Sequence, residues 1–73
     1  MHVSELKIGE EAVIEHVEEG NVFLKLLDMG CVPGENIKVE FVAPFGCPIA
    51  VRVSGYVLSM RLAEASSIKV RKL

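Results

Sequence analysis

The chain has 73 residues, of which 51% are hydrophobic, and its eight basic and ten acidic side chains give a net charge of −2. A domain of this size buries only about 60% of the surface that its unfolded chain exposes, so docking onto a partner or a second copy would add useful stability. The charge balance argues against nucleic-acid binding as the main role, because such binding depends on concentrated positive charge, and Lys69, Arg71 and Lys72 form only a small basic tip.

The first expected element is a strand over residues 12–17, where β-branched side chains are frequent. Ala12 and Ile14 share one face of such a strand, but strict alternation would place His16 on that face in place of Val17. We therefore expect a β-bulge near His16 that returns Val17 to the core.

A short helix is expected over residues 22–29, with Asn21 as its N-cap and Gly30 just beyond its C-terminus. Its apolar side chains recur three and four positions apart, at Phe23, Leu26 and Leu27. A helix of about two turns is marginal alone in water. We therefore expect it to form by packing this apolar face on a sheet.

Two further segments, 37–41 and 49–53, alternate apolar and polar residues, which is typical of half-buried strands. In the first, the residues expected on the inward face are Ile37, Val39 and Phe41. The short connection over residues 43–48 is rich in proline and glycine, so the two strands are expected to form an antiparallel pair.

Gly55 permits a sharp bend before a strand over residues 56–60. A helical turn near residues 61–65 then leads to a closing strand over residues 67–71. Five short strands with brief turns and one inserted helix predict an all-β fold, a small SH3-like barrel that forms a single domain over residues 1–73. Closure of the barrel would remove the exposed edges of the sheet.

Glycines and prolines separate these elements at unusually high density. The positions expected to be turns or caps are Gly9, Gly30, Pro33, Gly34, Pro44, Gly46, Pro48 and Gly55. A framework bent so tightly leaves little room for a deep catalytic cleft, and no nucleophile–base arrangement or glycine-rich phosphate loop is present. The pattern therefore favours an interaction module over an enzyme.

Two cysteines, Cys31 and Cys47, are too few for a disulfide scaffold and too widely spaced for a CxxC metal site. We expect Cys31 to be a small buried side chain, and Cys47 to lie exposed in a turn. The N-terminus lacks the pattern of a signal peptide, and no apolar run approaches the roughly 20 residues of a membrane span. These features predict a soluble cytoplasmic protein with free thiols.

Taken in order, the motifs resemble the FeoA family, the small cytoplasmic component of bacterial and archaeal ferrous iron transport systems. The matching segments are LKIGEEA at 6–12, LLDMG at 26–30, VPG at 32–34, APFG at 43–46, PIAV at 48–51, GYVLSMR at 55–61 and EA at 64–65. Two positions depart from the family pattern. Lys25 stands where Arg is usual, and Cys47 stands where Asp or Gly is common.

The resemblance implies an SH3-like barrel without enzymatic activity whose partner is FeoB, the ferrous-iron permease with a cytoplasmic G domain. The domain type also resembles the C-terminal module of metal-dependent repressors. A transition-metal sensor or carrier is therefore the competing interpretation, and a barrel attached to another regulatory system is a third.

The candidate partner-binding residues are Lys25, Asp28, Met29 and Arg61. A structural interpretation stays open beside this one. Asp28 would then end the helix and Met29 would fill a gap in the core, while Arg61 would bond turn carbonyls or Glu64. At position 25 a lysine replaces arginine poorly wherever a bidentate contact is needed.

The candidate metal ligands are His2, His16 and Cys47, which lack the short spacing of a dedicated site. We expect no required cofactor, and at most weak binding of Fe²⁺ or Zn²⁺ together with glutamate side chains. The N-terminal half is acidic and the C-terminus is basic. This asymmetry provides solvation, or else a dipolar surface for docking or for head-to-tail formation of a homo-oligomer.

Overall fold

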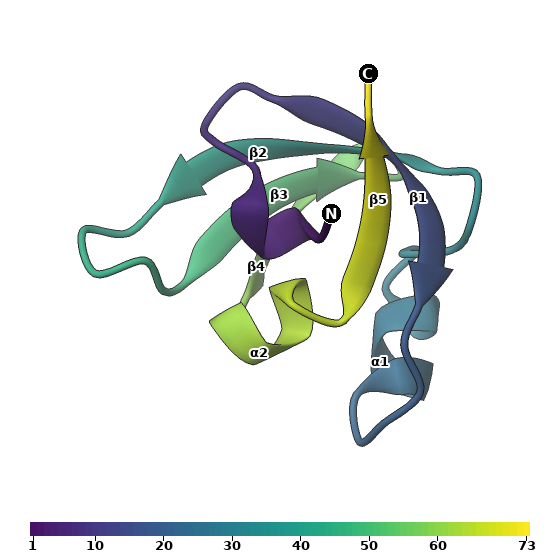
Figure 1. Cartoon of the computed structure of the whole chain (residues 1–73). Coiled ribbons are helices and arrows are strands. Elements are labelled where there is room, and N and C mark those ends of the chain that lie inside the picture. The colour runs from purple at the N-terminus through teal and green to yellow at the C-terminus, as the bar shows by residue number, and fades with distance from the viewer.

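A five-stranded antiparallel sheet forms the body of the protein (Figure 1). The computed structural model describes all 73 residues. The strands are β1 (Glu11–Val17), β2 (Asn36–Val42), β3 (Ile49–Val53), β4 (Tyr56–Met60) and β5 (Ile68–Lys72). The helices are η1 (Val3–Glu5), α1 (Phe23–Asp28) and α2 (Leu62–Ala65). The predicted all-β architecture with two small helices is confirmed, and η1 was not expected.

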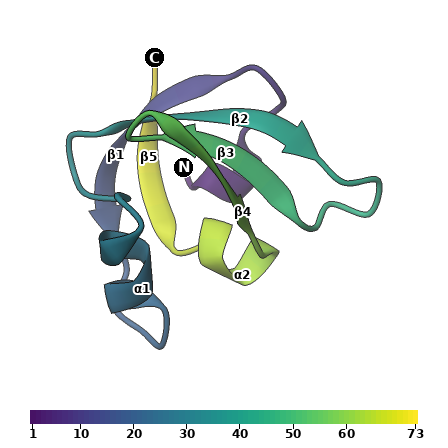
Figure 2. The same ribbon diagram turned by 180° about the vertical axis from the view of Figure 1, so that it is seen from behind.

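The sheet order is β4-β3-β2-β1-β5, so β4 and β5 are the outer strands. The sheet is strongly curved, and α2 connects its two outer strands across the open side (Figures 1 and 2). The barrel is thus completed by α2, because β4 and β5 do not pair with each other. The expectation that closure removes both sheet edges is wrong for this reason.

The expected bulge in β1 is present. Ile14 pairs with Val70 of β5 and His16 pairs with Lys69, so one residue of β1 has no partner in β5. This extra residue turns His16 to solvent and returns Val17 to the core, where its side chain is 2% exposed.

A second bulge, in β2, overturns the expectation that Phe41 faces inward. Val39 pairs with Val51 of β3, but Phe41 pairs with Ala50, so the register shifts by one residue. Phe41 consequently lies on the outer face with 55% of its surface exposed. Val42 takes the inward position and packs against the core.

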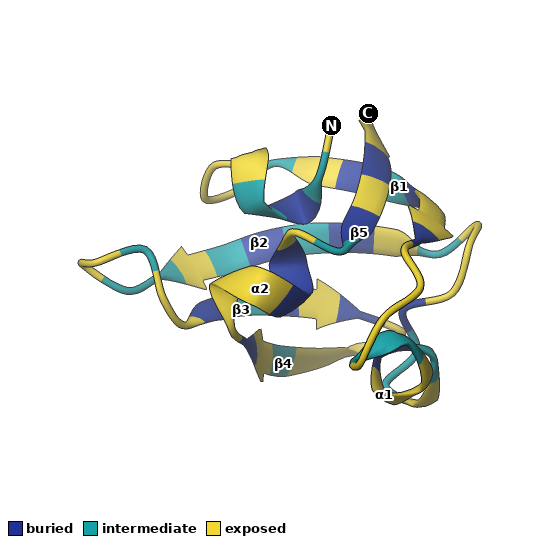
Figure 3. Cartoon of the chain, turned by 60° about the horizontal axis from the view of Figure 1, so that its bottom comes forward, coloured by how far each residue is buried: buried dark blue, intermediate teal, exposed yellow.

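One hydrophobic cluster of 16 buried side chains fills the inside of the curved sheet (Figure 3). The strands supply most of it through their inward-facing residues. The other parts of the chain contribute Val3, Leu6, Leu26, Cys31 and Ala65. Leu26 is fully buried, so α1 forms because its apolar face packs on this core.

The start of α1 differs from the expectation. Val22 is the N-cap residue, and no side chain caps the helix. The chain enters through a turn in which the Phe23 amide donates to the Gly20 carbonyl at 3.2 Å. Because this turn places Asn21 one position before the cap, its prediction as N-cap is wrong.

The end of α1 follows the expectation. Gly30 has a φ of +93°, and its amide donates to the Leu27 carbonyl at 3.0 Å. The Cys31 amide donates to the Leu26 carbonyl, also at 3.0 Å. These two bonds form a Schellman motif, and the buried side chains of Cys31 and Leu26 supply its apolar contact.

The other predicted turn positions are also confirmed by the backbone. Glycines with positive φ are Gly9, Gly30, Gly34, Gly46 and Gly55. The prolines Pro33, Pro44 and Pro48 all lie in connections between elements. None of the helices has the length and apolar character that crossing a bilayer requires.

Replacing Gly30 with valine should lower the free energy of unfolding by about 3 kcal/mol. A Cβ at this position would lie 2.7 Å from Ser54 Oγ and 3.1 Å from Ser54 Cβ, in addition to the strain of the positive φ. Gly34→Val is the matched control, because its φ is +95° but no atom lies within 4 Å of the added Cβ. Urea unfolding measures both, and equal losses would show that the approach of Gly30 to Ser54 is unimportant.

Candidate functional site

Three of the four candidate partner-binding residues meet where α1, α2 and β4 come together. The Lys25 ammonium lies 2.8 Å from Glu64 Oε2, and the Arg61 backbone amide donates to Glu64 Oε1 at 2.8 Å. The Tyr56 hydroxyl donates to the Met29 carbonyl at the end of α1. We name this surface the helix corner. Its residues are those that make these contacts, Lys25, Met29, Tyr56, Arg61 and Glu64, together with Asp28, which ends α1 directly before Met29.

Glu64 connects the two helices of this corner. Its side chain is 8% exposed, and its two oxygens accept from different elements. The hydrogen bond from Lys25, followed by that from the Arg61 amide, lowers the pKa of Glu64 below its usual 4.5 and outweighs the opposing effect of burial. Glu64 is therefore a buried carboxylate that stays ionised at neutral pH.

The contact between Lys25 and Glu64 was not predicted, because 39 positions separate the two residues. The spacing of Arg61 and Glu64 did carry a signal, since a glutamate three residues after the N-cap can accept the N-cap amide. The donor is the backbone amide of Arg61, however, and not its guanidinium. Arg61 is exposed, so its charge faces solvent.

At position 25, a lysine suits this contact. The ammonium contacts only one carboxylate oxygen, while the other oxygen accepts the Arg61 amide. No bidentate pairing is required here, so a lysine is sufficient to connect the two helices.

Asp28 and Met29 end α1 in different ways. The Met29 side chain is half-buried and packs against the core, as its structural interpretation expects. Asp28 is exposed in the last turn of the helix and makes no side-chain hydrogen bond or ion pair. A carboxylate at a helix C-terminus is disfavoured by the helix dipole, so helix stability does not account for Asp28.

The buried thiol lies near this corner. Cys31 is fully buried, as expected, and burial together with the charge of Glu64 raises its pKa to about 11. Cys31 therefore remains a neutral thiol at physiological pH.

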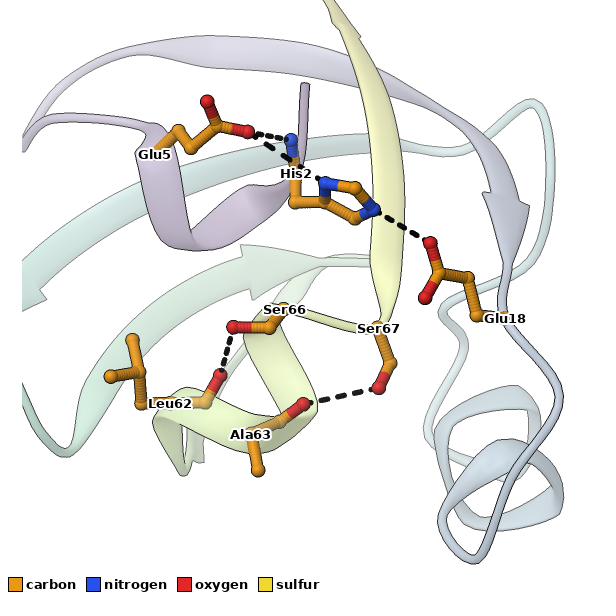
Figure 4. Close-up of polar contacts among 7 residues, drawn as sticks. All are labelled: His2, Glu5, Glu18, Leu62, Ala63, Ser66 and Ser67. Carbon is orange, nitrogen blue, oxygen red and sulfur yellow. Dashed lines mark hydrogen bonds and ion pairs between the residues drawn. The ribbon is translucent and has the colours of Figure 1, made fainter.

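The candidate metal ligands lie elsewhere. The His2 ring has Nε2 at 2.7 Å from Glu18 Oε2 and Nδ1 at 3.7 Å from Glu5 Oε1 (Figure 4). His2 and His16 both pair with Lys69, so this lysine separates the two histidines. The structure contains no group of three or more His, Cys, Asp or Glu side chains that could hold a metal ion.

Cys47 is exposed, as expected, in the connection between β2 and β3. Its sulfur accepts the Leu62 amide at 3.4 Å at the start of α2. At the other end of α2, the hydroxyls of Ser66 and Ser67 donate to helix carbonyls at 2.8 and 3.1 Å (Figure 4). Cys47 thus belongs to the surroundings of α2 and not to those of His2.

A hollow of about 270 Å³ lies over β2, β3 and the turn that leads into β4. Most of its lining residues are polar, with charges of both signs: Glu11, Glu35, Lys38 and Arg52. It holds no cysteine or histidine and no pair of groups arranged as nucleophile and base.

The chain resembles proteins of ferrous iron transport along its whole length. The family described as FeoA domain matches residues 1–72. A fusion protein of Fe(2+) transport protein A and Fe(2+) transporter FeoB from Porphyromonas gingivalis is 42% identical over 71 residues. The match covers 96% of this chain and only 8% of the fusion protein.

Solved structures show the same likeness. The FeoA protein from Chlorobium tepidum is 42% identical with a TM-score of 0.91, over 100% of this chain and 70% of that one. Stenotrophomonas maltophilia FeoA, solved with zinc and described as an SH3 domain protein, is 29% identical with a TM-score of 0.85, over 96% and 88% of the two chains. A manganese-dependent transcriptional repressor shares the fold alone, at 16% identity and a TM-score of 0.91, over 100% and 36%. The predicted SH3-like fold is confirmed.

Replacing Glu64 with glutamine should lower the free energy of unfolding by about 2 kcal/mol at pH 7, because Lys25 loses its partner and a part-buried charge-assisted contact to a buried carboxylate disappears. The folded pKa of Glu64 lies below 4.5, so its stabilisation is complete above that pH and is lost as the pH falls through the folded value. The difference in free energy of unfolding between the unmodified chain and Glu64→Gln should therefore shrink below pH 4.5.

Urea unfolding at a series of pH values measures this effect. Glu40→Gln is the control, because Glu40 forms a 2.7 Å ion pair with Arg52 on the surface, where such pairs contribute little. A loss from Glu64→Gln no larger than that from Glu40→Gln, or one independent of pH, would contradict the role assigned to Glu64.

Proposed function

Because the chain belongs to the FeoA domain family, we propose that it is a non-enzymatic accessory protein of ferrous iron uptake that binds the FeoB permease in the cytoplasm. The observation that carries this proposal is the Porphyromonas gingivalis fusion protein, which joins a close relative of the chain to the permease in one polypeptide. In a fusion, the two domains are held at high effective concentration. A domain of this family that is not fused to the permease needs a binding surface to achieve the same proximity.

The helix corner is our candidate for that surface. Asp28 has no partner within the chain and lies where the helix dipole disfavours a carboxylate, so a basic group of the permease would relieve an unfavourable charge. The exposed Arg61 supplies a guanidinium suited to a carboxylate or phosphate of the partner. Leu24 on the same helix is 70% exposed and adds apolar area. The contact is with the G domain or the membrane-proximal part of the permease.

Metal binding has weaker support as a function. The zinc in the Stenotrophomonas maltophilia structure belongs to that protein, and the strongest counterpart here is the pair formed by His2 and Glu18. One imidazole and one carboxylate are fewer ligands than a specific site uses. We therefore propose that no cofactor is required and that Fe²⁺ or Zn²⁺ binds only weakly at His2.

Asp28→Lys and Arg61→Glu should each weaken binding to the permease's cytoplasmic domains at least about tenfold, because each reverses a charge at the proposed contact. Arg71→Glu on β5 is the matched control for Arg61→Glu, since it makes the same charge change at an exposed residue of another element. A pull-down followed by titration, with GDP, with a GTP analogue and without nucleotide, measures binding. Absence of binding in every nucleotide state would exclude the proposed function, whereas equal loss in all three variants would exclude only the helix corner.

Anaerobic titration of the reduced protein with Fe²⁺ should give a dissociation constant in the millimolar range, because only two ligands converge at His2. His2→Ala should abolish this binding, while Cys47→Ser should leave it unchanged. Micromolar affinity that survives in His2→Ala would instead support a metal sensor or carrier with a site elsewhere.

A further inference from the structure

The two edges of the sheet differ in how well they are protected from pairing with another strand. At the β5 edge, the Val70 amide donates to the Met1 carbonyl at 2.8 Å, and His2 forms a bridge with Lys69. The strand also carries Lys69, Arg71 and a second lysine at its end. A covering segment and charged side chains are both known means of preventing a sheet edge from pairing. The β5 edge is therefore closed to a further strand.

The β4 edge has neither protection. Its sequence, YVLSM, has no charged residue and no proline. β4 pairs only with β3, and no strand lies on its other side (Figure 3). Val57 is 47% exposed and Ser59 is also exposed. An uncharged, uncovered edge strand is a template for the addition of another strand.

The turn between β3 and β4 fixes which backbone groups of β4 are free. Ser54 has a φ of +53° and Gly55 a φ of +84°, the signature of a type I′ turn. A two-residue turn of this kind closes on a hydrogen-bonded pair, which here is Val53 and Tyr56. Every second residue counted from Tyr56 therefore bonds to β3.

The residues between them turn their N–H and C=O groups outward. These are Val57 and Ser59, and neither takes part in any backbone hydrogen bond outside the regular elements. The edge thus presents two amides and two carbonyls, separated by Leu58 at the centre of the strand.

We propose that two copies of the chain pair antiparallel through β4, about a two-fold axis at Leu58. In this register Val57 lies opposite Ser59 of the second copy, and each such pair exchanges two hydrogen bonds. All four free groups of each edge are then used, and the two sheets become one continuous sheet of ten strands. The inference is independent of the proposed function, because the backbone groups that it uses belong to Val57 and Ser59, which are not residues of the helix corner.

The side chains along this seam are compatible with self-pairing. On the outer face, the small side chains of Val57 and Ser59 meet, and the neighbouring charge, Arg52, is already paired with Glu40 at 2.7 Å. On the inner face, the half-buried Leu58 meets its own copy. No like charges approach each other, so the uncharged edge is complementary to itself. This favours a second copy over a strand of another protein.

The contact is small. Five residues from each copy bury less than the roughly 1,200 Å² at which stable specific interfaces begin. The dimer is therefore weak and forms at high protein concentration, or where a partner gathers several copies.

Cysteine cross-linking in the full chain tests the register. In a Cys47→Ser background, Leu58→Cys places two sulfur-bearing residues across the axis with a Cα–Cα distance of about 4.5 Å, within the range of a disulfide. Val57→Cys and Ser59→Cys place them diagonally at about 7–8 Å, outside that range. Under mild oxidation, Leu58→Cys should form covalent dimer at least about tenfold faster than the other two variants. Absence of dimer, or equal rates at all three positions, would overturn the proposal.

Sedimentation of the unmodified chain and two lysine variants tests the edge itself. Val57→Lys should raise the dimer dissociation constant at least about tenfold, because a charge on an edge strand opposes pairing. Phe41→Lys is the control, since Phe41 is exposed on the same outer face but belongs to β2. A chain that stays monomeric at millimolar concentration would overturn the proposal. An equal rise of the dimer dissociation constant in both lysine variants would also overturn it, because that result would indicate that dimers form by stacking of the outer faces.

Discussion

The placement of α1 is the constraint on which the helix corner depends. A helix of six residues does not form alone, so its position is set by what holds it. Leu26 is buried in the core, Gly30 turns the chain beneath Ser54, and the Lys25 ammonium contacts the buried carboxylate of Glu64. These three contacts act at the middle, the end and the outer face of the helix. They give a short, otherwise marginal helix one orientation, and that orientation creates the helix corner.

The two bulges show what the sequence could and could not predict about the fold. In β1 the sequence pattern itself was irregular, because strict alternation would have placed His16 inward and Val17 outward. A bulge was therefore the simplest way to bring Val17 into the core. In β2 the alternation of Ile37, Val39 and Phe41 was perfect, and nothing in it indicated a shift. The shift follows from pairing with β3, which is a property of the assembled sheet. Tertiary pairing overrode a regular local pattern.

The same distinction holds at the candidate site. Gly30 was predictable as a helix end because the requirement for positive φ is local. The partnership of Lys25 with Glu64 was not, because it joins residues brought together only by the fold. The family resemblance predicted a partner protein for the chain, but it predicted no contact between residues of the chain itself. Lys25, a predicted partner-binding residue, contacts Glu64 within the chain while its side chain remains 61% exposed, whereas Asp28 and Arg61 are exposed and form no ion pair within the chain.

The helix corner and the β4 edge meet at one residue. Tyr56 begins β4, and its hydroxyl bonds to the Met29 carbonyl at the end of α1. Its backbone is directed toward β3, so strand addition at the edge leaves this contact unchanged. A pair of chains joined through β4 therefore carries two intact helix corners related by the two-fold axis. In the proposed dimer, two corners on one body would bind more tightly than one wherever two copies of the proposed partner lie within reach. The proposed pairing would thereby give a small domain with a modest core both stability and affinity through the edge that its own fold leaves open.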